Sequence, residues 1–227
     1  MNRLSFTADG SHTLLSQQFG VDYHSTHGAI QESRHVFLKH GLMPLLESGQ
    51  TVIEILEMGF GTGLNVLAVR QLAENWPGVQ FNITSFELFP VTQADIAGIN
   101  YPELMGVPLA WLTELHAAEW EVPVAITPNV SLRKLRQDFL KVAPRPYPLH
   151  FFDVIFYDAF APRSQPEFWT QDAMRICLAA LKPGGVFVTY CAKGQFKRDL
   201  RDAGFKVEAL PGPPGKREMT RGRVVSL

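Results

Sequence analysis

Cysteine and long hydrophobic runs are both scarce in this sequence. Cys177 and Cys191 are the only cysteines among 227 residues, and they do not form a C-x-x-C pair. We therefore expect two reduced core thiols in a cytoplasmic protein and no disulfide framework. No run approaches the roughly 20 apolar residues that a membrane-spanning helix needs. Residues 1–20 also lack the apolar segment of a secretory signal peptide.

Histidine clusters and a strong net charge are absent as well. The seven histidines show no metal-site spacing, so we expect no metal centre. A net charge of −1 argues against a general nucleic-acid-binding protein. Residues 193–227 nevertheless carry nine basic and four acidic side chains, a net +5 (9 − 4), which leaves −6 for the rest (−1 − 5). This basic end could face phosphate, but a solvated helix face with a basic edge strand explains it equally well.

The order of apolar segments predicts an α/β protein. With 46% hydrophobic residues, 227 residues suffice for one domain with a full core. Strand-like and helix-like segments alternate after residue 50, which is typical of a Rossmann-like, doubly wound and mostly parallel sheet. Only a Pro/Gly loop separates the last two strands, so we expect the last strand to be antiparallel. We divide the single domain 1–227 into an N-terminal hairpin and helix extension, 1–50, and a Rossmann-like core, 51–227.

Turn residues and periodicity give the bounds of individual elements. We expect a hairpin over residues 3–16 and a helix over 28–46. Pro90 suits the first turn of a helix that continues to Ile99. A further helix over 168–181 should stop at Lys182-Pro183-Gly184-Gly185. The expected strands of the core are 52–56, 81–87, 124–126, 130–135, 151–157, 185–191, 205–210 and 219–227.

The segment 52–65, V-I-E-I-L-E-M-G-F-G-T-G-L-N, is the central motif. A short apolar strand is followed by Gly59, Gly61 and Gly63 at alternating positions, and then by good helix formers. Glycine is needed where the backbone takes φ > 0 or lets a ligand approach closely, and the helix start offers free N–H groups. The spacing differs from the dinucleotide fingerprint G-x-G-x-x-G, which disfavours a nicotinamide-dependent dehydrogenase.

Acidic residues beside this motif indicate which ligand it binds. Glu57 precedes the first glycine, where a carboxylate would repel a pyrophosphate and attract a cation. S-adenosylmethionine carries a sulfonium and an ammonium, and its ribose needs hydrogen-bond acceptors. Glu87 ends the next strand, 24 residues after Gly63 (87 − 63), near the offset of about 20 residues expected for a ribose-binding carboxylate. The alternative is an ordinary βαβ unit whose acids are solvated strand ends.

Two further strand ends carry an acid close to an aromatic residue. Asp138 and Phe139 suit an adenine, the carboxylate binding its exocyclic amine and the ring covering its face. Asp158, followed by Phe160 and Pro162, is the candidate for the reaction side, where the aromatic ring can form a wall of the methyl-transfer site. The alternative for this aspartate is a helix N-cap. Because ligands of open α/β sheets bind at the carboxyl ends of strands, we expect all four acids to lie near one site.

With these motifs the chain resembles class I S-adenosylmethionine-dependent methyltransferases. More narrowly, it is similar to the tRNA 5-methylaminomethyl-2-thiouridine methyltransferase family, the methyltransferase part of MnmC-type enzymes. The similarity rests on G-A-I-Q-E-S-R-H-V-F at 28–37, E-M-G-F-G-T-G-L-N at 57–65, S-F-E at 85–87, D-A-F-A-P at 158–162 with Trp169-Thr170, P-G-G at 183–185 and G-K-R-E-M at 215–219. Ala159 stands where bifunctional members tend to have glycine, a change that keeps Asp158 and Phe160.

This resemblance implies N-methylation of the 5-aminomethyl group of 5-aminomethyl-2-thiouridine at the wobble position of a tRNA anticodon stem-loop. Bifunctional members carry a flavin oxidase domain after the methyltransferase. These 227 residues have no room for one, so we expect a stand-alone form that works after a separate flavin oxidase. The expected catalytic residues are Asp158 and Phe160. The expected cofactor-binding residues are Glu57, Gly59, Phe60, Gly61, Thr62, Gly63, Asn65, Glu87, Asp138, Phe139 and Asp158. The expected substrate-binding residues are Tyr23, Glu32, Pro162, Lys216 and Arg217.

The chemistry of an amine acceptor leaves alternatives open. The amine must be neutral to attack a methyl group, and a carboxylate such as Asp158 raises the pKa of an ammonium, so we assign it an orienting role. Of the adjacent cations Lys216 and Arg217, one is expected to face the pocket and the other the RNA. A methyltransferase acting on another amine, or a non-catalytic RNA-binding or cofactor-sensing module, remains possible. The basic end favours RNA over a small molecule, and the intact D-x-F-x-P loop favours an enzyme.

Overall fold

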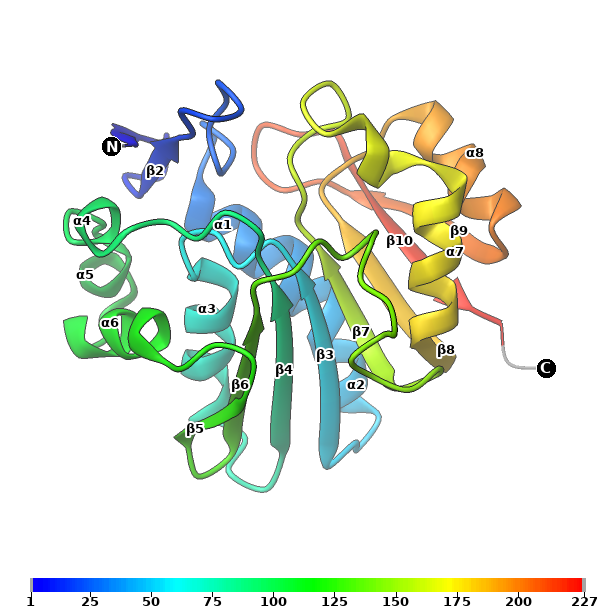
Figure 1. Cartoon of the computed structure of the whole chain (residues 1–227), viewed down its shortest axis with the longest axis horizontal. Coiled ribbons are helices and arrows are strands. Elements are labelled where there is room, and N and C mark those ends of the chain that lie inside the picture. Colours follow the sequence, from blue (N-terminus) through cyan, green and yellow to red (C-terminus); the bar gives the residue numbers. More distant parts are fainter. Residues whose placement is uncertain (1, 226–227) are drawn as a thin grey trace.

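The computed structural model describes residues 2–225 and contains one large sheet with helices on both faces (Figure 1). Its strands are β3 (Val52–Met58), β4 (Gln80–Phe86), β5 (Pro123–Thr127), β6 (Val130–Leu135), β7 (Phe152–Tyr157), β8 (Leu181–Thr189), β9 (Phe205–Pro211) and β10 (Glu218–Val224). They are arranged in the order β5-β6-β4-β3-β7-β8-β10-β9. The strands from β6 to β8 in this order are mutually parallel. β10 runs antiparallel between β8 and β9, as predicted, and β5 is an antiparallel edge strand.

The remaining elements are a hairpin and a set of mostly short helices. The hairpin consists of β1 (Arg3–Phe6) and β2 (His12–Leu15), which pair antiparallel. The helical elements are α1 (Ala29–Ser33), the π-helical segment η1 (Arg34–Leu42), α2 (Met43–Glu47), α3 (Leu64–Ala73), α4 (Gln93–Ile96), α5 (Tyr101–Met105), α6 (Leu109–Ala117), the 3-10 turn η2 (Pro166–Trp169), α7 (Gln171–Ala180) and α8 (Gly194–Asp202).

Two hydrophobic cores cover the two faces of the sheet. Because side chains alternate along a strand, Val154 and Phe156 of β7 join the core formed with α1, η1 and α3. Their neighbours Ile155 and Tyr157 join the core formed with α7 and α8. All six residues of β7 are buried, which explains its nearly continuous apolar sequence. The strand is thus central in the sheet, and the residue after it, Asp158, emerges at the sheet's carboxyl edge.

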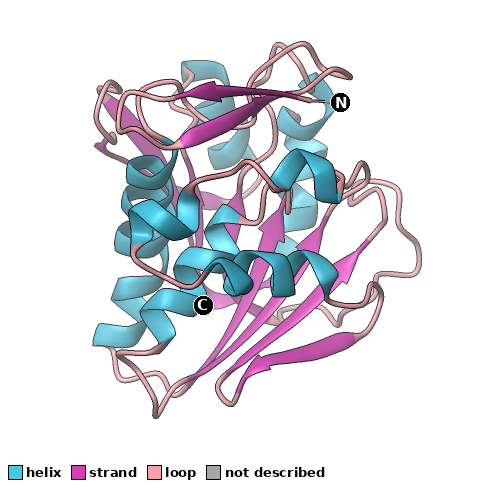
Figure 2. Cartoon of the chain, turned by 90° about the vertical axis from the view of Figure 1, so that its left-hand side faces the viewer, coloured by secondary structure: helices cyan, strands magenta, loops and turns pink. Residues whose placement is uncertain are grey.

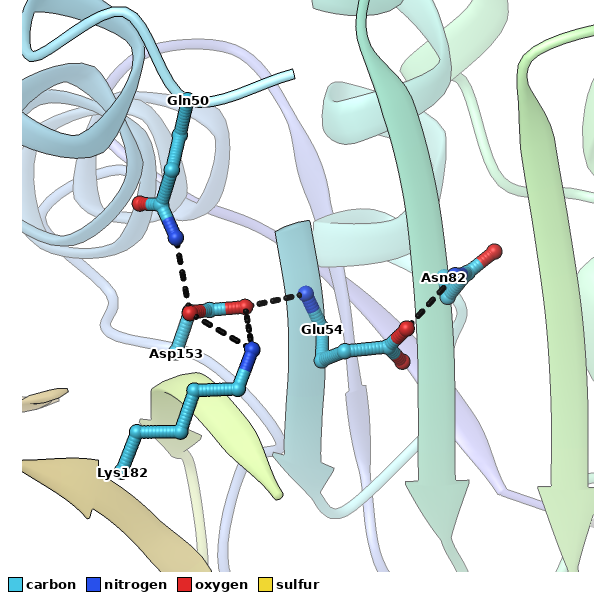
Figure 3. A network of polar contacts seen from close by, with 5 residues as sticks. All are labelled: Gln50, Glu54, Asn82, Asp153 and Lys182. Atoms are coloured by element: carbon cyan, nitrogen blue, oxygen red, sulfur yellow. Dashed lines mark hydrogen bonds and ion pairs between the residues drawn. The ribbon is translucent and has the colours of Figure 1, made fainter. Parts of the chain in front are cut away.

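A buried carboxylate near the opposite edge of the sheet joins β3, β7 and β8 (Figure 3). Asp153 accepts hydrogen bonds from the backbone N–H of Glu54 at 2.8 Å, the amide of Gln50 at 2.8 Å and Nζ of Lys182 at 2.9 Å. Asn82 of β4 in turn donates to Glu54 at 2.7 Å. These bonds satisfy a charge that burial would otherwise penalise. They also hold three strands in register, so that their carboxyl ends line up at the site.

The N-terminal hairpin lies across one end of the sheet (Figure 2). Asp9, in the hairpin turn, accepts hydrogen bonds from the backbone N–H groups of Ser11 and Gln31, each at 3.0 Å. Burial of this carboxyl opposes its ionisation, but bonds from Ser11, Gln31 and Thr7 hold its pKa below the usual value. Asp9 therefore fastens the hairpin to the first turn of α1.

Three predicted elements were placed wrongly. No helix starts at Pro90, because Thr92 forms a capping box with Asp95 and α4 begins only after it. The helix predicted from residue 168 begins at Gln171, after the Thr170 N-cap. The strand predicted over 185–191 begins earlier, because β8 starts at Leu181. The segment 183–185 therefore lies within β8, where its pairing with β7 shifts register. The final strand ends at Val224, and residues 226–227 of the prediction lie outside the described part.

Candidate active site

The glycine turn between β3 and α3 brings backbone close to two other segments. Gly59 has φ of 90°, and a Cβ there would lie 3.2 Å from the carbonyl oxygen of Asp158. Gly61 has φ of 49°, and a Cβ there would lie 3.1 Å from the ring of Tyr23. A side chain at either position would be strained and crowded. The turn therefore needs these glycines to pack between β7 and the N-terminal loop.

Glu87, the residue after β4, reaches across to this turn. Its carboxylate accepts hydrogen bonds from the N–H of Gly61 at 3.0 Å and from the N–H of Phe89 at 2.8 Å. Burial raises the pKa of this carboxyl, and the bonds from Phe89 and Gly61 partly oppose the rise. Glu87 thus orients the turn and presents an acceptor at the cavity that the turn borders.

Glu57 lies inside the sheet, two residues before the turn. The Ser85 hydroxyl donates to its Oε2, whereas Oε1 is buried and has no hydrogen-bond partner among the described residues. Burial raises the pKa of this carboxyl to about 8, against the effect of the Ser85 hydrogen bond. A buried acceptor without a partner is costly.

Asp158 is held by a short chain of hydrogen bonds. The Ser33 hydroxyl donates to the Asn65 side-chain oxygen at 2.6 Å, and the Asn65 amide donates to Asp158 Oδ2 at 2.9 Å. Burial and then the nearby charge of Glu32 raise the pKa of Asp158 to about 8, whereas Asn65 and Lys216 act in the opposite direction. The carboxyl is therefore oriented by α1 and α3, and near neutral pH it can either give or take a proton.

These groups border a cavity of about 330 Å³ at the carboxyl edge of the sheet. This volume is within the range of small-molecule sites, about 300–1,000 Å³. The expected site residues that line it are Tyr23, Gly59, Phe60, Gly61, Asn65, Glu87, Asp138, Phe139, Asp158 and Phe160. The expected residues that do not line it are Glu32, Glu57, Thr62, Gly63, Pro162, Lys216 and Arg217.

Aromatic rings form one wall of the cavity. The Phe160 ring lies with its centre 4.8 Å from Phe19 and 5.0 Å from Tyr23, and Phe19 lies 5.9 Å from Phe89. The loop that carries Phe160 is fixed, because its N–H donates to Gln165 at 3.0 Å. The N-terminal loop thus contributes aromatic rings that pack against Phe160 at one side of the cavity.

Thr62 lies in the glycine turn and its side chain is fully buried. Its hydroxyl lies 2.7 Å from His24 Nε2 and accepts from Tyr101 at 3.3 Å, while its carbonyl lies 2.9 Å from His116 Nε2. Burial lowers the pKa of both histidines to about 4, so both are neutral near pH 7. In this structure, the turn residue Thr62 contacts the protein and not the cavity.

A buried lysine that sequence patterns did not single out holds the far side of the turn. Lys134 of β6 donates to the carbonyls of Leu115 at 2.9 Å and His116 at 2.8 Å, at the end of α6. Its ammonium lies 4.6 Å from the centre of the Trp120 ring. Burial lowers its pKa to about 8. By ordering the end of α6, Lys134 positions the histidine that contacts the Thr62 carbonyl.

The two adjacent cations Lys216 and Arg217 were predicted to lie on the last strand. In the structure they lie in the turn before β10, so this prediction was wrong. Their environments differ, but neither side chain lines the cavity, so the expected division between pocket and RNA stays a prediction. Lys216 is partly buried and forms an ion pair with the buried Glu32 of α1, whereas Arg217 is exposed. Pro162 is half-buried in the loop after Asp158. Lys216 is therefore held against α1, and Arg217 faces solvent.

Other cavity residues carry no recognisable sequence signal. Gln18 and Phe19 come from the loop after the hairpin, Gln137 precedes Asp138, and Gln165 and Phe168 follow the Asp158 loop. Within residues 2–225, no group of three potential metal ligands is found. In the same part of the chain, no helix has the length and apolar character needed to cross a membrane.

Comparison with known proteins adds to this geometry. A family model described as S-adenosyl-L-methionine-dependent methyltransferase matches residues 114–224. The tRNA 5-methylaminomethyl-2-thiouridine biosynthesis bifunctional protein MnmC of Methylobacillus flagellatus is 36% identical over 219 residues, which are 92% of this chain and 33% of that protein. The protein of the same name from Chromobacterium violaceum is 33% identical over 93% of this chain and 33% of its own length.

A solved structure is also similar over the whole chain. The crystal structure of MNMC2 from Aquifex aeolicus matches with a TM-score of 0.79 and 29% identity, covering 100% of this chain and 72% of that one. The present chain spans about one third of the length of the curated relatives named above. The Rossmann-like methyltransferase fold predicted from the motifs is thereby confirmed.

Proposed function

We propose that this chain, which belongs to the S-adenosyl-L-methionine-dependent methyltransferases, methylates the amino nitrogen of 5-aminomethyl-2-thiouridine at the tRNA wobble position. The observation that carries the proposal is the similarity over 92% of the chain to a protein named for tRNA 5-methylaminomethyl-2-thiouridine biosynthesis. The intact reaction-side pair, Asp158 and Phe160 in one cavity, supports an active enzyme.

The residues around the glycine turn fit S-adenosylmethionine. When bound, this cofactor supplies an electrophilic methyl group on a sulfonium. Glu87 lines the cavity and offers carboxylate oxygens to hydroxyl groups. Glu57 is buried and does not line the cavity, so it would favour a cationic end through its charge and not by direct contact. Asp138 and Phe139 provide an acceptor and a ring at another part of the same cavity. Gly59 and Gly61 have no side chain, so the cofactor could approach the backbone of the turn closely.

On the acceptor side, the chain's own residues would orient and deprotonate an amine. An alkylamine is mostly protonated at neutral pH, with a reference pKa of about 10.4 for lysine. Asp158, oriented by Asn65, would bind the amine and take up its proton, because burial already raises the pKa of this carboxyl to about 8. Phe160 and its aromatic neighbours would exclude water from the nitrogen. Such alignment is a large source of rate enhancement for a methyl transfer.

The proposed substrate defines the partners. We infer that a separate flavin oxidase activity provides the aminomethyl group, since the relatives are named as bifunctional proteins of this biosynthesis. The tRNA anticodon stem-loop would approach the open side of the cavity, and the exposed Arg217 is a candidate for a contact with its phosphates. We place this activity in the cytoplasm, where tRNA is modified.

Two tRNA preparations test the proposal. Labelled S-adenosylmethionine is offered with tRNA that carries the 5-aminomethyl group and with tRNA that lacks it. We expect label to enter only the first. Asp158→Ala should lower kcat at least a hundredfold, a loss of about 3 kcal/mol in transition-state stabilisation, with little change in cofactor Kd. Equal labelling of both tRNAs, or transfer to free alkylamines at a comparable rate, would favour the alternative amine acceptor.

A further inference from the structure

An ion pair next to the reaction side joins two distant parts of the chain. Lys216, ahead of β10, places its ammonium against the Glu32 carboxylate of α1, whose side chain is 8% exposed. The same ammonium lies 4.3 Å from the centre of the Tyr190 ring. Taking both charges out of water costs free energy, so such a pair is a poor stabiliser of the fold. The pair is instead linked to the Asp158 loop, because Tyr190 contacts both the Lys216 ammonium and the carbonyl of Ala159.

Both members of the pair act on Asp158 through space. Glu32 raises the pKa of this carboxyl, after the larger effect of burial, and Lys216 lowers it. The residue after Glu32, Ser33, holds the Asn65 side chain that donates to Asp158. On the other side, the Tyr190 hydroxyl donates to the carbonyl of Ala159, the residue after Asp158, at 2.8 Å. The ion pair and Asp158 therefore share one framework of short contacts.

The titratable groups that interact with Asp158 come from five places in the fold. They are Glu32 of α1, Glu57 of β3, Tyr101 of α5, Tyr190 after β8 and Lys216 before β10. Four of these five are acids or phenols, which favour a proton on Asp158 or leave it unaffected. Lys216 is the cation of the set.

We propose that Lys216 is an electrostatic residue of the transfer site, whose ammonium favours the neutral acceptor amine and the ionised Asp158. Glu32 and Tyr190 hold the ammonium in place. This inference rests on the proposed function, because it concerns an amine acceptor. A cation near the acceptor disfavours its ammonium form, and the same cation favours a carboxylate.

The acceptor loses one proton before the methyl transfer and one after it. The substrate ammonium gives one proton to Asp158 or to water. Its nitrogen lone pair then forms the new N–C bond with the methyl carbon, while the C–S bond of the donor breaks and leaves its electron pair on sulfur. The product is a secondary ammonium, which returns to neutral by losing a second proton. Lys216 is unchanged throughout and acts by its charge.

This role differs from contact with RNA phosphate. The Lys216 ammonium already contacts a buried carboxylate, so a phosphate would have to displace Glu32 from it. A phosphate contact would change the tRNA KM and its salt dependence. The proposed role changes the pH profile of transfer instead.

Opposite charge changes at the two ends of the pair give the test. The variants are Lys216→Met, Lys216→Arg and Glu32→Gln, with Lys39→Met at an exposed position of η1 as the matched control. The readout is kcat/KM for the aminomethyl tRNA against pH. We expect Lys216→Met to shift the rising part of the kcat/KM–pH curve to higher pH by about one unit. Glu32→Gln should shift it to lower pH by a similar amount. Lys216→Arg should restore the wild-type curve, and Lys39→Met should keep it.

A merely structural ion pair gives a different result. Loss of activity in both variants with no shift of the rising part of the curve, or a shift in the same direction, would overturn the proposal. A raised tRNA KM with a flatter salt slope in Lys216→Met would assign the lysine to phosphate instead. The side-chain carboxyl of Asp158 is also titrated by ¹³C NMR in these variants without tRNA. Opposite pKa shifts there with no methylation of the tRNA would reject the proposed function while keeping the charge effect, and absence of such shifts would reject the charge effect itself.

Discussion

Glu87 has two tasks at the level of the single residue. It fixes the glycine turn through the N–H groups of Gly61 and Phe89, and it faces the cavity. Glu87→Ala removes charge-assisted hydrogen bonds worth about 1.5–3 kcal/mol, so we expect the S-adenosylmethionine Kd to rise about tenfold to a hundredfold. Isothermal titration calorimetry measures this, with Glu87→Gln as the size-matched control and an intermediate Kd expected. An unchanged Kd in folded Glu87→Ala would refute the ribose assignment.

The buried carboxyl of Glu57 destabilises the fold when it is ionised. Burial raises its pKa to about 8, so the folded state binds this proton more tightly than the unfolded chain does. The resulting stability is present at low pH and is lost as the pH rises through about 8. We expect Glu57→Gln to raise Tm more at about pH 9 than at about pH 6, by about 2–4 °C per kcal/mol. It should also weaken cofactor binding.

Thermal unfolding of wild type and variant at both pH values checks this expectation. Glu74→Gln, at the exposed end of α3, is the matched control and should show no pH-dependent gain. An equal Tm change at both pH values would show that Glu57 is not the group that titrates.

The residues of the turn could be predicted because their chemistry is local. Gly59, Gly61 and Glu87 carry a spacing that strand, turn and helix geometry explains. Phe19 and Lys134 could not be predicted, because Phe19 reaches the cavity from a loop with no motif and Lys134 looks like an ordinary solvated strand lysine. Their roles depend on what the fold brings beside them, and that information is not local.

Among the elements, the N-terminal hairpin depends on one carboxylate. Asp9 binds the N–H of Gln31 and so caps α1, the helix that carries Glu32 and Ser33. We expect Asp9→Ala to cost about 0.5–2 kcal/mol, the usual value of a helix cap. Because the pKa of Asp9 is held below its usual value, its contribution is present above the unfolded pKa and is lost as the pH falls through the folded one.

Hydrogen exchange locates the effect of Asp9→Ala. Faster exchange in residues 3–33 with unchanged exchange in β7 would show local release of the hairpin, as we expect. Asp9→Asn, which keeps the acceptor oxygen, is the matched control and should keep most of the protection. Uniformly faster exchange throughout the sheet would contradict a local cap.

Errors in the predicted elements have a common physical origin. Pro90 is compatible with a helix start, but the bond from Phe89 N–H to Glu87 and the Thr92 cap prevent a helix before residue 93. Pro183, Gly184 and Gly185 usually end an element, yet here β8 tolerates them at a register shift beside β7. In both cases tertiary contacts outweigh local preference.

For the whole molecule, the sequence allowed the fold class and the antiparallel last strand to be predicted, but not the order of the strands. Insertion of β10 between β8 and β9, and addition of β5 at the edge, depend on pairings between distant segments. This topology carries Lys216 back to α1 and leaves Arg217 exposed, although neither residue lies on the strand as expected.

Arg217 tests whether this end of the molecule binds RNA. Phosphate contacts give salt-sensitive affinity without reading bases. We expect Arg217→Ala to raise the tRNA KM, to reduce the slope of log KM against log salt by about one, and to spare S-adenosylmethionine binding. Steady-state kinetics over a salt series measures this, with Arg175→Ala, an exposed ion-paired arginine of α7, as the control. An unchanged slope would mean that the basic end does not touch RNA.

The most direct measurement of the central claim is nucleoside analysis of the methylated product. Wild-type protein, S-adenosylmethionine with a labelled methyl group and tRNA bearing 5-aminomethyl-2-thiouridine are incubated, and the tRNA is digested and analysed by mass spectrometry. We expect the label in 5-methylaminomethyl-2-thiouridine from the wobble position, and at least a hundredfold slower labelling with Asp158→Ala. Label in any other nucleoside, or no transfer by a protein that binds the cofactor, would show that the chain does not methylate this aminomethyl group.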